Sequence, residues 1–186
     1  MAVRRSNPNA FAELDAKLKD LEGVQAKAGW PNVQHYAMDG PPVAYVASIQ
    51  EFGDGKIPPR PFMRPSVAEH GQEWMELAGK GAKAVLAGQV TATTALENVA
   101  LRAAGQIGKK IAALHAPPLS LITLMLRKWK AEHPGQKVTG ALVGQMAAQL
   151  RKGPPDLSGM TSTQMKPLIE TGFLLQQLTG VAEKVK

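Results

Sequence analysis

The chain has 186 residues, of which 44% are apolar and none is cysteine, and it carries 22 Lys and Arg against 15 Asp and Glu, a formal net charge of +7. This length suits one domain with a packed core, and the missing cysteines exclude disulfides, thiolate metal sites and cysteine nucleophiles. No apolar run approaches the roughly 20 residues that cross a bilayer, and no apolar signal region follows Met1, so we expect a soluble protein with no membrane partner.

The positive charge lies in the second half of the chain. Residues 1–101 hold 10 basic and 11 acidic side chains, whereas residues 102–186 hold 12 basic and 4 acidic ones. Such a surplus predicts a nucleic-acid or acidic-protein partner, although a solvated lysine and arginine surface explains the same counts. Only Trp129 lies among these cations, whereas a base-stacking surface needs several aromatic residues.

The first fifty residues predict a helix, a strand and a second helix. Large apolar side chains recur every three or four residues over 8–22, which is typical of a short amphipathic helix. Apolar residues then alternate with polar or small ones over 24–30, which indicates a strand. Residues 43–52 follow two prolines and favour a helix, although their β-branched content also fits a strand. The apolar residues of the first helix are Phe11, Leu14, Leu18 and Leu21.

A proline-rich arm and two long helices follow. Residues 57–65 contain four prolines, and each proline pushes the residue before it out of the α region, so we expect a rigid, extended arm. The arm is also a candidate third strand over 57–64. Apolar side chains at helical spacing predict amphipathic helices over 66–87 and 92–115.

Two further helices and a last strand complete the prediction. Ser120 is positioned to cap a helix that runs through Trp129, and Thr139 opens another helix that ends at Lys152. Residues 153–164 read as a polar loop and 178–185 as a strand. We therefore predict a single α+β domain over 1–186, in which a small, mostly antiparallel sheet packs on the two long helices, with additional helices towards the C-terminus.

No local pattern indicates catalysis or a cofactor. Residues 53–56 contain two glycines and a lysine but lack the spacing of a phosphate-binding loop, so they read as a turn. Glu13 and Asp20 lie on the polar side of the first helix, about two turns apart, and no serine sits in a nucleophile elbow. An enzyme is therefore disfavoured, and no catalytic, cofactor or metal-ligating residue is predicted. The histidines, none of them at metal-ligand spacing from another, are His35, His70, His115 and His133.

Four segments of the chain, in order, resemble one known family. Residues 43–53 (VAYVASIQEFG) and 57–65 (IPPRPFMRP) are similar to the "EFG … iPaRPF" signature of tailed-bacteriophage virion morphogenesis proteins, the tail-completion and neck components, including those of Mu-like phages. Residues 117–120 (PPLS) and 166–172 (KPLIETG) are similar to the later "PLs..T…R…kPLidTG.L" part of the same proteins. The T, R and final L positions of that part are matched by Thr123, Arg127 and either Leu174 or Leu175.

The order and rough spacing of the four segments agree from residue 43 to residue 175. The chain departs from the family over 131–165, where it has extra helical sequence that we predict to be an insertion. The resemblance implies a non-enzymatic virion protein that forms a ring at the head–tail junction or at the head-proximal end of the tail. It also implies assembly in the host cytoplasm, and contacts with further copies, with other neck or tail proteins, and with DNA in the channel.

The proline arm suggests how copies join. A stiff arm loses little entropy on docking, so we predict that Phe62 anchors in a neighbouring subunit and that Arg60 pairs with a carboxylate such as Glu51 of the next copy. In the alternative interpretation, residues 51–53 cap a helix with a buried phenylalanine, and Arg60 and Arg64 are exposed. The predicted interface residues are Glu51, Phe52, Pro59, Arg60, Pro61, Phe62 and Arg64.

A second prediction comes from a different functional class. The basic second half of the chain is also consistent with a DNA-binding or packaging accessory protein.

Overall fold

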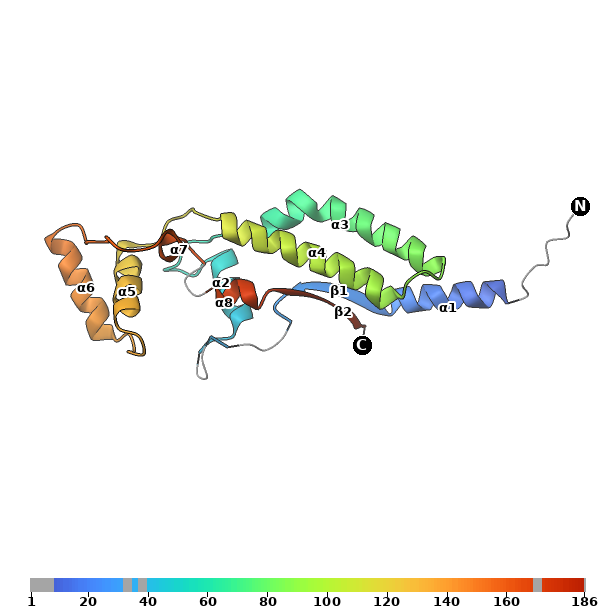
Figure 1. Ribbon diagram of the computed structural model, residues 1–186, viewed down its shortest axis with the longest axis horizontal. Helices are drawn as coiled ribbons and strands as arrows, with labels where there is room; N and C mark the ends of the chain where they lie inside the picture. Colours follow the sequence, from blue (N-terminus) through green and yellow to red (C-terminus); the bar gives the residue numbers. More distant parts are fainter. Residues whose placement is uncertain (1–8, 32–34, 37–39, 169–171, 186) are drawn as a thin grey trace, which may run out of the picture.

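The computed structural model describes residues 9–31, 35–36, 40–168 and 172–185. Its elements are α1 (Ala10–Glu22), β1 (Val24–Gly29), α2 (Val43–Phe52), α3 (Met63–Leu86), α4 (Ala92–Ala113), α5 (Leu121–Glu132), α6 (Gly140–Lys152), α7 (Ser162–Met165), α8 (Phe173–Gln176) and β2 (Thr179–Lys184). The molecule is elongated, with α1 at one end, the α5–α6 pair at the other, and the sheet and two long helices between them (Figure 1). The predicted start of the first helix at residue 8 lies outside the described residues.

The fold is α+β, as predicted, with a two-stranded antiparallel sheet packed against the long helices α3 and α4. β1 and β2 come from opposite ends of the chain, with Val24 opposite Lys184 and Gly29 opposite Thr179. Both predicted strands are therefore confirmed. Residues 43–52 form a helix, so the helical interpretation of that segment holds and the strand alternative is wrong.

The candidate third strand at 57–64 is wrong. Within the described residues the sheet contains β1 and β2 only, and Ile57 forms an isolated bridge with Asp54 instead. Three prolines between residues 58 and 61 remove backbone donors that a sheet ladder needs, and the chain already turns into α3 at Met63. The extended part of the predicted arm is therefore short, and its last residues belong to a helix.

β2 lies directly on α4, because glycine at position 180 leaves the strand without a side chain at the contact. A Cβ placed on Gly180 would fall 2.2 Å from the carbonyl carbon of Ala100. The buried face of α4 is rich in alanine, which keeps the surface of that helix shallow enough for the strand backbone to approach. Small residues on both sides thus fix how closely sheet and helix pack.

α3 and α4 form an antiparallel pair, close to the predicted 66–87 and 92–115. Buried packing near the connection involves Val85 and Ala92, while charged side chains link the exposed sides of the two helices. Glu73 accepts hydrogen bonds from Arg102 Nε at 2.8 Å and from Gln106 Nε2 at 2.7 Å. The Arg102–Glu73 ion pair is exposed, so apolar packing contributes more to the pairing of the two helices than this ion pair does.

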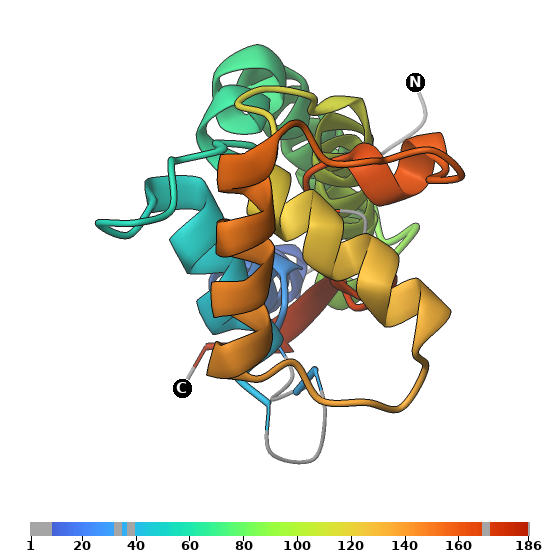
Figure 2. The same ribbon diagram turned by 90° about the vertical axis from the view of Figure 1, so that its left-hand side faces the viewer.

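The two predicted caps of the second half are confirmed. Ser120 Oγ accepts a hydrogen bond from the Thr123 N–H at 3.1 Å at the start of α5, and Thr139 Oγ1 accepts one from Leu142 N–H at 3.3 Å at the start of α6. The two helices lie side by side at one end of the molecule, as the view onto that end shows (Figure 2). α6 has no buried residue, so this pair is packed on one side only.

Candidate functional site

The carboxylate of Glu51, in the last turn of α2, caps the first turn of α3. Its Oε2 accepts hydrogen bonds from the backbone N–H groups of Phe62 at 2.7 Å and Met63 at 2.9 Å. Its Oε1 accepts from the backbone N–H of Arg64 at 3.1 Å and from Arg64 Nε at 3.0 Å. Helix N-termini present unpaired N–H groups and a positive dipole end, which a carboxylate satisfies. Glu51 therefore determines where α3 begins.

This arrangement keeps Glu51 ionised although its side chain is only 3% exposed. Burial by itself raises the pKa of the Glu51 carboxyl. The three backbone N–H groups of Phe62, Met63 and Arg64, together with the Arg64 side chain, outweigh that effect and hold the pKa below its ordinary value of 4.5. Arg64 also donates from Nη2 to the Glu51 carbonyl at 2.9 Å, so the two residues are joined twice.

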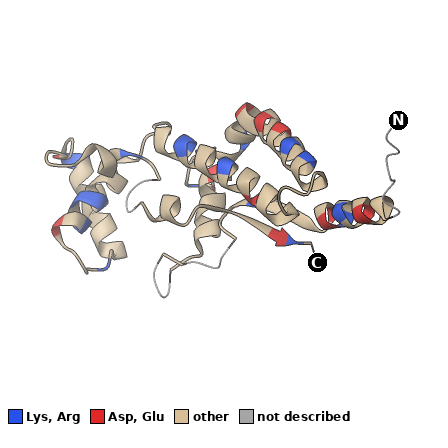
Figure 3. Ribbon diagram, turned by 45° about the vertical axis from the view of Figure 1, so that its right-hand side comes forward, with Lys and Arg blue, Asp and Glu red and all other residues tan. Residues whose placement is uncertain are grey.

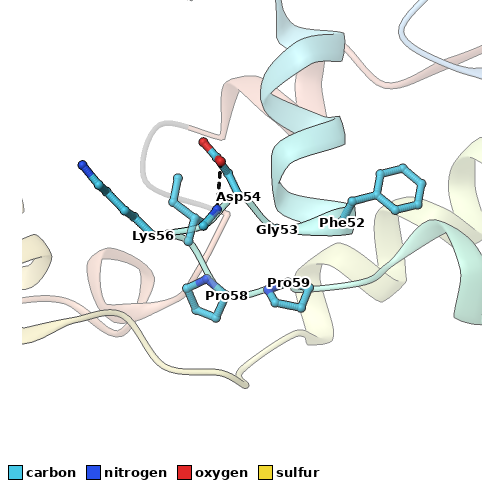
Figure 4. Close-up of a pocket in the computed structure, with 8 residues that line it drawn as sticks. Phe52, Gly53, Asp54, Lys56, Pro58 and Pro59 are labelled. Carbon is cyan, nitrogen blue, oxygen red and sulfur yellow. Dashed lines mark hydrogen bonds between the residues drawn. The ribbon is translucent and has the colours of Figure 1, made fainter.

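A tight turn connects α2 to this helix cap, and it is the turn that the sequence predicted at 53–56. Gly53 has φ +81°, and a Cβ there would lie 2.9 Å from the Ile57 carbonyl oxygen. Asp54 N–H donates to Ile57 O at 3.0 Å, and Asp54 Oδ1 accepts from Gly55 N–H at 2.8 Å. Figure 4 shows the turn with Phe52 and Lys56 pointing away from it to opposite sides. The turn needs glycine at 53, because the left-handed conformation and the close carbonyl both exclude a side chain.

Arg60 ties the arm to a distant segment. Its side chain is 5% exposed and donates from Nε to Pro117 O at 2.9 Å and from Nη2 to Pro118 O at 3.1 Å. It also bonds to Gln50 Oε1 at 3.3 Å, while its backbone N–H donates to Gln50 O at 2.7 Å. Burial, and then the charge of nearby Arg127, lower the pKa of Arg60. The guanidinium thus holds the segment around 117–118 against the end of α2.

Arg127 makes the equivalent link further along. From α5, its Nη1 donates to the carbonyls of Gln164 and Lys166, each at 2.8 Å. Lys166 in turn reaches back with Nζ to Ala112 O at 3.5 Å, near the end of α4. The residues of the 166–172 segment at 169–171 lie outside the described part of the chain. Charged side chains therefore join the first three segments that carry the family resemblance, and they hold the start of the fourth against α5 and the end of α4.

The structure corrects the predicted role of Phe62. Its ring is 0% exposed and lies in the core of its own chain with Val43, Ile107 and Leu174, edge-on to Trp30 at a centroid distance of 5.9 Å. A ring buried in this way is not available as an anchor for a neighbouring subunit. The sequence showed the aromatic residue at the end of the arm, but it could not show that the arm folds back onto the core.

The predicted pairing of Arg60 with Glu51 of the next copy is also wrong for these side chains. Each is buried and uses its hydrogen bonds within the chain: Arg60 on backbone carbonyls and on Gln50, Glu51 on α3. The alternative interpretation held for the cap and for Arg64, which is exposed, but not for Phe52, which is exposed rather than buried, or for Arg60, which is buried. Among the predicted interface residues, Phe52, Pro59 and Arg64 are exposed and Pro61 is partly buried, so their place in an interface stays a prediction.

Because Phe62, Arg60 and Glu51 are buried, the candidate surface for contact with other molecules is an exposed aromatic face on α2. Phe52 is 65% exposed, with the Arg64 guanidinium 5.0 Å from its ring centroid, and Tyr45 is 57% exposed one heptad earlier on the same helix. Beside Phe52 lies an apolar hollow of about 260 Å³ lined in part by Trp30 and Met63. Sequence reasoning missed Tyr45, although its seven-residue spacing from Phe52 indicates a shared face.

No feature of this site indicates a metal or a membrane span. The described residues hold no group of three or more His, Cys, Asp or Glu that could bind a metal ion. His70 lies on α3 beside Glu69 and Glu73, and those two carboxylates pair with Lys110 and Arg102 of α4. None of the helices that the structure describes is both long enough and apolar enough to cross a membrane.

Comparisons with protein-family models, with curated proteins and with solved structures find no match for this chain.

Proposed function

We propose that this chain is a non-enzymatic structural protein of a tailed-phage virion, a tail-completion or neck component that forms a ring at the head–tail junction or at the head-proximal end of the tail. One observation carries the proposal. Hydrogen bonds of Glu51 and Arg60 join the first three of the four segments that resemble this family, and Arg127, on the helix that follows the third, holds the start of the fourth.

Physical chemistry explains why such segments would recur as a set. Each of the three charged side chains directs its hydrogen bonds to backbone groups of another segment, so the residue type at one position depends on the path of the chain at another. Buried charges persist only where they are paired or hydrogen-bonded, which restricts substitution at each of these positions. This interdependence supports taking the four segments as one signature rather than as separate chance similarities.

The exposed face of α2 supplies the surface for assembly. Aromatic residues and arginine are the types that contribute most at protein interfaces. Here Tyr45 and Phe52 lie on one face of α2, and Arg64 of α3 lies over the Phe52 ring. Contacts between different faces of identical copies close into rings when the rotation permits. The α2 face is therefore our proposed contact with a neighbouring protein of the ring.

Electron microscopy of particles from the phage that encodes the chain tests the proposal. We expect ring-shaped density at the neck or tail end that accommodates this fold. When the chain is absent, we expect heads and tails that have not joined. A double variant, Tyr45→Ser with Phe52→Ser, should fold but fail to enter particles, whereas Val67→Ser, at another exposed apolar position, should enter normally. Mass spectrometry that accounts for every protein of the particle without finding this chain would refute the proposal.

A second function, DNA binding, is favoured by the charge of the α5–α6 pair. Residues 121–152 contain six Lys and Arg against one Glu, and Figure 3 shows basic residues on these helices. Phosphate contacts release counterions, so DNA binding by the isolated chain should weaken steeply as salt rises. Tight, strongly salt-dependent binding, combined with absence from particles, would favour this function over the first.

A further inference from the structure

The exposed side of α2 combines a protruding ring with a hollow beside it. Phe52 is 65% exposed, and the apolar hollow of about 260 Å³ at its side is also lined by Ala44 and Ser48 of the same helix. The hollow therefore follows α2 for about two turns, from Phe52 back to Ala44. An apolar cavity of roughly 150 Å³ holds benzene, so this hollow has room for one phenyl ring.

The charged groups at this hollow balance each other. The two charged side chains among its lining residues are Glu51 and Arg64, which form an ion pair at 3.0 Å. The turn after Phe52 adds one charge of each sign, at Asp54 and Lys56. A strongly charged partner such as DNA therefore gains little here, whereas a second copy of the same face brings no unpaired like charge against it.

Small side chains between the two aromatic rings of α2 let another helix approach. Tyr45, Ser48 and Phe52 are spaced by three and four residues, so they lie on one exposed stripe, with the exposed Ala44 beside it. If two antiparallel α2 helices cross at Ser48, Phe52 of one copy lies opposite Ala44 of the other, because both are four residues from the crossing point. Ala44 lines the hollow, so the protruding ring of one copy meets the hollow of the other.

We propose that, before assembly, the α2 faces of two copies cover each other across a two-fold axis at Ser48, with Phe52 of each copy in the hollow of the other. Such a contact is isologous, since the same surface serves both copies. Its role rests on the proposed function: the dimer covers the surface that the ring contact uses, so it has to open before a copy enters the ring.

The size of the face makes this dimer weak. Tyr45 and Phe52 are 57% and 65% exposed. An aromatic side chain has roughly 150–250 Å² to bury, so the four rings of a dimer contribute about 400–600 Å². A stable interface buries roughly 1,200 Å² or more. We therefore expect a dimer that dissociates readily, as a surface that is later released to another partner requires.

The chain contains no cysteine, so single cysteines can report the geometry of the contact. Ser48→Cys places its thiol on the proposed axis, where helices packed about 8–10 Å apart bring the two Cα atoms within reach of a disulfide. Ala44→Cys lies on the same face, but about 12 Å along the helix from its counterpart, which is too far.

Under mild oxidation, we expect Ser48→Cys to form a covalent dimer at least about tenfold faster than Ala44→Cys. Thr93→Cys, at an exposed position on α4, is the second control and should be equally slow. Equal rates for the three variants would overturn the inference, because cross-linking would then reflect random collisions. Faster cross-linking of Ala44→Cys than of Ser48→Cys would also overturn it, because the helices would cross elsewhere.

Sedimentation of the purified chain tests whether the ring of Phe52 holds the dimer. Phe52→Ser should lower the association constant at least about tenfold, because removal of a central aromatic anchor is costly. Ser48→Glu places two like charges at the axis and should abolish association. Both positions are exposed, so the helical circular dichroism signal should not change. A wild-type chain that stays monomeric up to about 1 mM refutes the dimer.

The exposed stripe on α1 supplies the matched control for this measurement. It consists of Phe11, Leu14 and Leu18, which are 88%, 43% and 44% exposed. Phe11→Ser removes an exposed phenylalanine ring outside the α2 face and should leave self-association unchanged. If Phe11→Ser weakens association and Phe52→Ser does not, the α1 stripe makes the contact and the inference is refuted.

Entry into particles separates this inference from the proposed function. The oxidised Ser48→Cys dimer should fail to enter particles and should enter after reduction, because its α2 face is covered until then. Equal entry of the two forms would refute the covering role of the dimer. A dimer in solution with no chain in particles removes the proposed function alone, whereas a ring in particles built from a chain that is monomeric in solution removes this inference alone.

Discussion

Replacing Glu51 with glutamine tests whether one carboxylate sets the start of α3. The carboxylate receives four hydrogen bonds, two on each oxygen, and three of them come from backbone N–H groups. Glutamine keeps one acceptor oxygen and turns an NH₂ group towards the other pair of donors. In either orientation of the amide, its NH₂ group faces two of the four N–H donors, which lose their acceptor. The other two donors bond to a neutral oxygen in place of a charged one.

The expected loss follows from these contacts. A hydrogen bond to a charged group contributes about 1.5–3 kcal/mol, and a buried donor left without a partner costs about 1–3 kcal/mol. Arg64 is largely exposed and recovers hydration, which lowers the total, so we expect Glu51→Gln to reduce the free energy of unfolding by about 2–4 kcal/mol. For a chain of this size that corresponds to a fall in Tm of roughly 4–16 °C.

Urea and thermal unfolding followed by circular dichroism measure this loss. Glu97→Gln, on the exposed side of α4, is the matched control and should stay within about 0.5 kcal/mol of the wild type. If Glu51→Gln is as stable as Glu97→Gln, the carboxylate does not hold the helix start and the reasoning fails.

The pH dependence gives the same residue an independent test. Because the pKa of Glu51 in the folded chain lies below its ordinary value of 4.5, its ionised form stabilises the fold at pH values above 4.5. That stabilisation is lost as the pH falls through the folded-state pKa. The difference in stability between wild type and Glu51→Gln should therefore be full near pH 7 and shrink below about pH 4.5.

Three further substitutions test the turn, the strand contact and the arm, each by urea unfolding. Gly53→Ala should lower the free energy of unfolding by about 1–3 kcal/mol, because the backbone at residue 53 is left-handed and a carbonyl oxygen lies 2.9 Å from the new Cβ. Gly55→Ala, where the new Cβ meets open space, should leave the free energy of unfolding nearly unchanged. Gly180→Ala should lower the free energy of unfolding by at least about 3 kcal/mol, because the new Cβ pushes β2 off α4. Gly144→Ala, on α6, should raise the free energy of unfolding by up to about 1 kcal/mol. Equal effects of the two substitutions would contradict the close packing of β2 on α4. Arg60→Lys should lower the free energy of unfolding by about 1–3 kcal/mol, since a lysine cannot donate to the carbonyls of Pro117 and Pro118 at the same time with the geometry of a guanidinium. An unchanged urea midpoint would show that these two hydrogen bonds do not stabilise the fold.

The sequence alone was enough to predict most of the elements. Apolar spacing located α4 and both strands, the prolines before residue 43 indicated α2, and the caps at Ser120 and Thr139 marked the starts of α5 and α6. These features depend on residues a few positions apart, so the signal for them is complete within a short window.

For the candidate site, the sequence pointed to residues 51–64 as a subunit interface, but it assigned several of these residues the wrong role. Residues 51–64 do form the centre of the junction, but the predicted anchor Phe62 is in the core, and Arg60 bonds to carbonyls at 117 and 118. Nothing near Arg60 in sequence indicates those partners, which are 57 and 58 residues away.

The tertiary structure also decided where α3 begins and which apolar faces stay uncovered. Proline spacing predicted an arm that stays extended through residue 65, but Glu51 turns its last residues into a helix from Met63. The stripe on α1 reads as an ordinary core-facing stripe, and only the folded chain shows that nothing described packs against its first turns. Helix and strand periodicity comes from neighbours along the chain, whereas burial and hydrogen-bond partners depend on segments that meet only after folding.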